Sequence, residues 1–123
     1  MTPVAQELAL MANRAGQNST FVVVPDIPPE KVPELDGVAT VYLSQKDAGS
    51  IEALRSILHR FNGFTTVLGA GVLDSPSTLL VSGAVDGVLM VVQRGRTMRD
   101  DVERARHQVE TAGGTVVGSV LAR

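Results

Sequence analysis

Five residues of this chain have types and positions that suit the binding of an anion or of a polar partner surface. Gly69 and Gly71 flank one alanine directly after a β-rich run, where backbone amides without side chains can approach an anion. Three arginines follow a second apolar run, at the sheet edge where open α/β folds bind their ligands. The candidate site residues are therefore Gly69, Gly71, Arg94, Arg96 and Arg99.

Both groups also have a plain structural explanation. Glycines often serve tight turns, and exposed arginines commonly pair with nearby acids, here Asp100 and Asp101, with little gain in stability. The sequence contains neither the GxxxxGK[ST] string of a phosphate loop nor the GxGxxG string of a dinucleotide fold. The glycines are thus more typical of a turn, and the arginines are the most site-like patch.

No group of residues stands out as catalytic or metal-binding. Cysteine is absent, which excludes thiol catalysis and cysteine-based zinc sites. His59 and His107 fall on separate expected helices, and neither has a second histidine four residues away. We expect both histidines at the surface, and we predict no catalytic residue, no metal and no cofactor.

The composition is that of one globular domain. The 123 residues are 44% hydrophobic and carry 11 Lys and Arg against 13 Asp and Glu, so no excess charge draws the chain to nucleic acid or to an anionic membrane. The most apolar stretch, 65–92, is interrupted by Asp74, Pro76 and Asp86, which excludes a membrane span. We expect a single domain over 1–123, in the cytoplasm, without a signal peptide or direct membrane insertion.

Helical and strand patterns alternate along the chain. Apolar residues at helical spacing predict helices over 3–15, 51–61 and 98–112 and a short helical segment at 79–81, with Ser50 and Thr97 as N-caps. Short β-branched runs predict strands at 21–24, 38–43, 65–68, 87–92 and 115–121. The prolines between 25 and 33 predict an extended loop over 25–37 without any regular element. This alternation predicts a three-layer α/β/α domain with a mainly parallel sheet of about five strands.

A string of spaced features runs from residue 61 to residue 121. Asp86 and Gly87 enter an apolar strand, Arg94-Gly95-x-Thr97 follows it, and an amphipathic helix ends before the final strand. Together these features resemble the C-terminal half of the deviant-Walker P-loop ATPases, and they are most similar to the cytoplasmic domain of bacterial tyrosine kinases of capsule and exopolysaccharide assembly. The resemblance covers about half of the chain and implies a P-loop NTPase-like fold without the P-loop.

The first sixty residues fit the same family in two ways. In the first, helix 3–15 is the helix after the family's phosphate loop, Phe21–Asp26 is the second strand with its aspartate, and the central strand is missing. In the second, Phe21–Val24 is the central strand, and Pro25–Val32 replaces the phosphate loop. We prefer the second, because a missing central strand leaves buried backbone groups unpaired unless another chain fills the gap.

By this resemblance, the parts of the family that hold nucleotide are absent from the sequence. There is no Gly-Lys-Ser/Thr for the phosphates and the magnesium ion, and the family's acidic residue after the third strand falls at about Leu68 to Gly69. The base-reading asparagine corresponds to about Ala122, and Tyr42 is the only tyrosine where the kinases have a tyrosine-rich tail. The resemblance therefore implies a degenerate, truncated relative that neither hydrolyses ATP nor phosphorylates itself.

Two functions from different classes are consistent with these observations. The first is a non-catalytic pseudo-ATPase that binds or regulates a protein of exopolysaccharide or capsule assembly. Its expected partner is a membrane polysaccharide co-polymerase, which would recruit it to the inner face of the membrane, or a second copy of itself. The alternative is a small-ligand module in which the two glycines and three arginines bind a nucleotide or a phosphate-bearing metabolite without hydrolysis.

Overall fold

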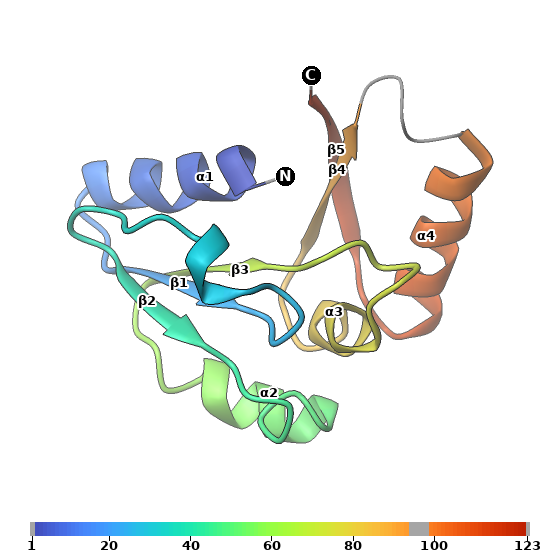
Figure 1. Cartoon of the computed structure of the whole chain (residues 1–123), viewed down its shortest axis with the longest axis horizontal. Coiled ribbons are helices and arrows are strands. Elements are labelled where there is room, and N and C mark those ends of the chain that lie inside the picture. Colours follow the sequence, from blue (N-terminus) through green and yellow to red (C-terminus); the bar gives the residue numbers. More distant parts are fainter. Residues whose placement is uncertain (1, 94–98, 123) are drawn as a thin grey trace.

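The computed structural model describes residues 2–93 and 99–122 of the chain. Helices and strands alternate along it as the sequence predicts, and Thr97, the predicted N-cap of the last helix, lies outside the described residues (Figure 1). The elements are α1 (Thr2–Arg14), β1 (Ser19–Val23), the 3-10 turn η1 (Pro29–Lys31), β2 (Ala39–Tyr42), α2 (Ile51–Leu58), β3 (Phe64–Leu68), α3 (Pro76–Ser82), β4 (Val88–Gln93), α4 (Arg99–Thr111) and β5 (Val116–Ala122).

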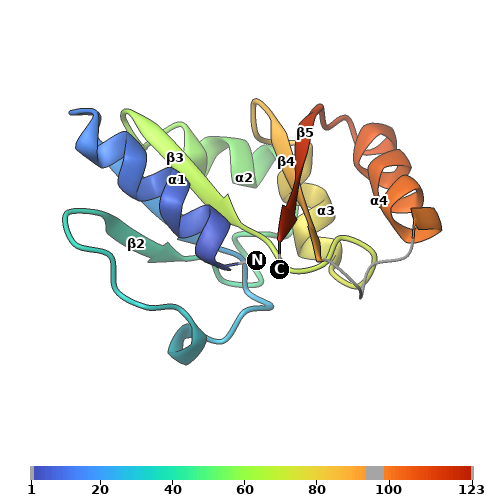
Figure 2. The same ribbon diagram turned by 90° about the horizontal axis from the view of Figure 1, so that it is seen from above.

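The five strands pair only in parallel, but they form two sheets. The larger sheet has the order β2-β1-β3, and the smaller one joins β4 to β5. Figure 2 shows β4 and β5 beyond β3, on the side away from β2. The predicted α/β class and the parallel pairing are confirmed, while the expected single sheet is interrupted between β3 and β4.

This interruption bears on the two readings of the first sixty residues. The preferred reading takes Phe21–Val24 as the central strand of one continuous sheet, and the described residues do not form such a sheet. β1 instead lies in the middle of the three-stranded sheet, and the break leaves β3 and β4 each with one unpaired edge. An interior break is what the other reading, with a missing central strand, implies. The stated preference was therefore wrong.

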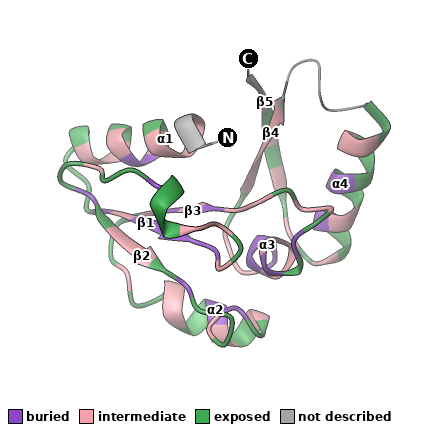
Figure 3. Ribbon diagram, in the orientation of Figure 1, coloured by how far each residue is buried: buried purple, intermediate pink, exposed green. Residues whose placement is uncertain are grey.

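The core is divided by the larger sheet into two layers, because successive side chains of a strand point to opposite faces. Phe21 and Val23 of β1 are fully buried on the α1 side, beside Ala9. Val22 and Val24 are buried on the other side, where Leu54 of α2 and Val81 of α3 cover them. Figure 3 shows this buried band running through β1 and β3 between the helices. Helices on both faces complete the predicted three-layer arrangement.

Residues at the ends of several helices explain where those helices begin or stop. The hydroxyl Oγ of Ser50 accepts a hydrogen bond from the backbone N–H of Ala53 at 3.1 Å, which confirms the predicted N-cap of α2. Gly16 follows α1 with φ +84°, a left-handed conformation that glycine adopts without strain. The prediction of no regular element over 25–37 was wrong at η1, where Pro29 has the fixed φ that a helical first position needs.

Helix α4 covers the smaller sheet through the face predicted from its sequence. Ala105 and Val109 are buried, whereas Val102 and Ala112 are half-buried at the ends of the same stripe. Over residues 2–93 and 99–122, none of the helices combines the length and the hydrophobicity that crossing a bilayer requires.

Candidate functional site

Gly69 and Gly71 lie in the loop that leads from β3 to α3. Neither residue has a positive φ, so neither is needed for a left-handed turn. A Cβ atom on Gly69 would lie 2.7 Å from the methyl carbon Cγ2 of Thr78 on α3, whereas a Cβ on Gly71 would meet only the Oδ2 atom of Asp74 at 3.9 Å. A side chain at position 69 would therefore force the Thr78 side chain to shift, whereas Gly71 is exposed and has no close neighbour at its Cβ position.

A polar cluster that the sequence analysis did not select lies at the carboxyl ends of β1 and β2. The hydroxyl of Ser75, 2% exposed, donates a hydrogen bond to Oδ2 of Asp26 and accepts one from the N–H of Thr78 at 3.1 Å. The amide Nε2 of Gln45 lies 3.5 Å from Oδ1 of Asp26. Asp26 thus ties the end of β1 to the start of α3. In the sequence analysis Asp26 was singled out only by the first reading of the resemblance, as the aspartate of the second strand.

The turn after β2 holds Gln45 beside this cluster. The carboxylate of Asp47 accepts a hydrogen bond from the backbone N–H of Ser44 at 3.1 Å, and the hydroxyl of Ser44 accepts one from the N–H of Asp47 at 3.1 Å. The backbone N–H of Ser44 lowers the pKa of the Asp47 carboxyl from its ordinary value, and the Ser44 hydroxyl acts in the same direction. Asp47 is therefore ionised at neutral pH, and its contribution to stability is lost only as the pH falls through this lowered pKa.

Of the three predicted arginines, Arg94 and Arg96 lie outside the described residues. Arg99 is the first residue of α4, and its side chain is 90% exposed. Its Nε atom lies 3.7 Å from Oε1 of Glu103, one helical turn later, and not beside Asp100 or Asp101 as expected. Ion pairs between exposed side chains are weak, so Arg99 is able to exchange this partner for one on another molecule.

The two histidines are exposed, as predicted. His59 ends α2 and His107 lies on α4. In the part of the chain that the structure describes, histidine and acidic side chains form no group of three that could hold a metal ion.

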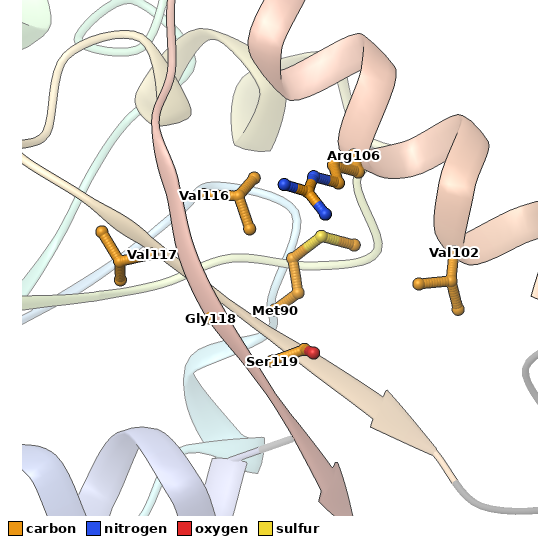
Figure 4. A pocket seen from close by; sticks show the side chains of 7 residues that line it. All are labelled: Met90, Val102, Arg106, Val116, Val117, Gly118 and Ser119. Carbon is orange, nitrogen blue, oxygen red and sulfur yellow. The ribbon is translucent and has the colours of Figure 1, made fainter.

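A pocket of about 190 Å³ lies between α4 and the smaller sheet (Figure 4). Arg106 points into it, and its Nε atom lies 3.1 Å from Oε1 of Glu110. Of the predicted site residues that the structure describes, Gly69, Gly71 and Arg99, none lines this pocket, which lies on the α4 face of the smaller sheet. Its lining consists of Met90, Val102, Arg106, Val116, Val117, Gly118 and Ser119.

Comparison with known proteins gives partial matches in sequence. No protein-family model matches the chain. Among curated proteins it is similar to the tyrosine-protein kinases CpsD of Streptococcus agalactiae serotype III and serotype Ia, with 34% identity over 71 residues in each case. These matches cover 58% of this chain and 29% of each kinase, so the chain spans less than a third of the length of these relatives.

Comparison of the fold with solved structures gives matches over nearly the whole of this chain. The kinase domain of the Escherichia coli tyrosine kinase ETK matches with a TM-score of 0.74 and 14% identity, over 96% of this chain and 60% of that domain. The chimerical protein CapA2B2 matches with a TM-score of 0.69 and 18% identity, over 96% of this chain and 68% of that one. At such identities the likeness concerns the fold. Together with the sequence match, it confirms the predicted resemblance to bacterial tyrosine kinases.

Proposed function

We propose that this protein acts in capsule or exopolysaccharide assembly by binding a protein partner, and that it does not transfer phosphoryl groups. The similarity to the CpsD kinases supports the pathway. The proposal that it is non-catalytic is supported most directly by Leu68 and Gly69, which stand at about the position where the resemblance places an acidic residue. Neither residue supplies a carboxylate to hold a magnesium-bound water, and a Cβ on Gly69 would lie 2.7 Å from Thr78 Cγ2, so a larger residue at position 69 would require the Thr78 side chain to move.

The partner surface in this proposal is the loop edge that carries the arginines. Arg99 is exposed and held only by a 3.7 Å ion pair with Glu103. The guanidinium group offers several donors in a fixed plane, which suits carboxylates on a partner protein. Because the pair with Glu103 is exposed and weak, Arg99 loses little when it turns to a carboxylate on a partner.

Substitution of the arginines tests this surface. We expect Arg99→Ala to weaken binding to the cytoplasmic segment of a membrane polysaccharide co-polymerase by about tenfold, which corresponds to about 1.4 kcal/mol. The triple change of Arg94, Arg96 and Arg99 to alanine should weaken it further. Biolayer interferometry with purified proteins gives the affinities.

Arg104→Ala is the matched control for these variants. Arg104 lies on the same helix, is 63% exposed and has an equally weak pair, at 3.5 Å, with Asp101. Binding that is unchanged in the triple variant, or that falls equally in the control, would show that this edge is not the partner surface.

Calorimetric titration distinguishes the partner-binding function from the alternative, in which the protein binds a small phosphate-bearing ligand. Asp74 places a carboxylate beside Gly71, and a negative charge at this point opposes the binding of an anion. We therefore expect no heat of binding when ATP, ADP or cyclic dinucleotides are titrated to millimolar concentration. A saturable heat that is lost on Gly71→Asp would favour the ligand-binding function instead.

A further inference from the structure

A second pocket, of about 390 Å³, lies at the edge of the larger sheet where its strands begin. Because β1, β2 and β3 run parallel, their first residues share this edge, and α1 ends there as well (Figure 1). The cluster around Asp26 lies at the opposite edge, at the carboxyl ends of the strands. We propose that this pocket binds a sugar acid, a ligand with several hydroxyl groups and one carboxylate, which goes beyond the proposed function. The lining residues on which the proposal rests are Asn13, Asn18, Thr20, Arg60, Phe61 and Asn62.

Three asparagine side chains give the pocket its hydrogen-bonding capacity. Each carboxamide presents one acceptor oxygen and two N–H donors. The hydrogen bonds found among residues 2–93 and 99–122 use none of the side chains of Asn13, Asn18 and Asn62. A hydroxyl group both donates and accepts hydrogen bonds, so a ligand rich in hydroxyls matches carboxamides together with the hydroxyl of Thr20.

Two glycines make room for two of these asparagines. Gly37 has φ +76°, and a Cβ atom there would lie 2.7 Å from Nδ2 of Asn13. Gly63 has φ +89°, and a Cβ there would lie 2.2 Å from the carbonyl oxygen of Asn18. That carbonyl also accepts the hydrogen bond from Phe64 at 2.7 Å. Backbone contacts therefore fix where the carboxamides start, and their polar ends are left for a ligand.

Arg60 supplies the charge that selects an acid. It is exposed, it is the one charged residue of the described lining, and the ion pairs found in the described part of the chain do not include it. A guanidinium group binds a carboxylate through two parallel hydrogen bonds. A single cation matches the single charge of a carboxylate better than the nearly double charge of a phosphate monoester at neutral pH.

Phe61 gives the pocket an apolar wall. Its side chain is half-buried and packs against the core layer that contains Leu54, while the rest of the residue lines the pocket. The carbon-bound hydrogens of a sugar ring form an apolar face that can lie on such a wall. The pocket volume is also within the range of about 300 to 1,000 Å³ that is usual for small-molecule sites.

NMR titration of the full chain with D-glucuronate tests the site, because the side-chain amides of the three asparagines report contact directly. We expect these signals to shift and to saturate, with a dissociation constant in the millimolar range. Arg60→Gln should weaken binding by about tenfold, the usual effect of losing a charge-assisted hydrogen bond. Arg104→Gln is the matched control and should leave the affinity unchanged, since Arg104 is 63% exposed on α4 and lies outside the lining.

Comparison ligands decide whether the site selects a sugar acid. D-Glucose, which has no carboxylate, should bind about tenfold more weakly than D-glucuronate to the unchanged chain. Equal binding of the two sugars, tighter binding of inorganic phosphate at the same amides, or no saturable shift with D-glucuronate would each overturn the inference. An oligosaccharide that ends in glucuronate separates two sources of this chemistry. Tighter binding than that of the monomer would identify a saccharide chain end as the ligand, and equal binding would identify the free acid.

Discussion

Replacing Gly63 with alanine should destabilise the fold by about 2 to 4 kcal/mol, the combined effect of backbone strain and overpacking. Gly63 has φ +89°, and a Cβ atom would lie 2.2 Å from the carbonyl oxygen of Asn18. This carbonyl accepts the hydrogen bond from Phe64 that aligns β3 with β1. Because the colliding atom belongs to the backbone, the strand start has to move to relieve the clash. Urea denaturation of the purified variant measures the loss.

Gly16→Ala separates the two contributions. Gly16 has a similar φ of +84°, but no atom lies within 4 Å of the position of its Cβ. This variant should lose about 1 kcal/mol, the strain of a left-handed conformation alone. If both variants lose the same free energy, the contact between Gly63 and Asn18 does not constrain the start of β3.

Phe21→Ala should lower the free energy of unfolding by about 3 to 5 kcal/mol, the usual loss for a large buried aromatic side chain. Phe21 has 0% exposure and belongs to the cluster that α1 closes over β1 and β3. Deleting the ring leaves a cavity between helix and sheet that the paired strands cannot collapse to fill. Thermal and urea unfolding both measure this change.

Phe64→Ala provides the control with the same chemical change. Phe64 begins the neighbouring strand β3 and is 39% exposed. Its truncation should cost about 1 to 2 kcal/mol, because less apolar area leaves water on folding. Equal losses at the two positions would contradict the division of the core described above.

Local sequence signals account for most of the fold. The strands β1 and β4 could be predicted from short runs of valine and other apolar residues, and the N-cap of α2 from Ser50, because these patterns act within a few residues. Alternation of the elements then gave the parallel α/β class. Pro29 shows why a cluster of prolines does not by itself predict the absence of regular structure. The proline ring excludes a strand, but its fixed φ favours the first position of a helical turn.

Contacts between distant segments account for what could not be predicted. Asp26 and Ser75 are 49 residues apart in sequence, and only the fold brings the hydroxyl to the carboxylate. The role of Gly69 likewise depends on the approach of Thr78. The break between β3 and β4 is a property of strand order, which the periodicity of single strands does not encode.

The central claim, that this protein binds a partner without using nucleotide, is tested most directly by one affinity measured under two conditions. Biolayer interferometry of the full chain on the cytoplasmic segment of a membrane polysaccharide co-polymerase should give the same dissociation constant with and without magnesium and ATP. This result is expected because Leu68 and Gly69, at the end of β3, supply no carboxylate to hold a magnesium-bound water. No binding in either condition, or binding that requires magnesium and ATP, would contradict the claim.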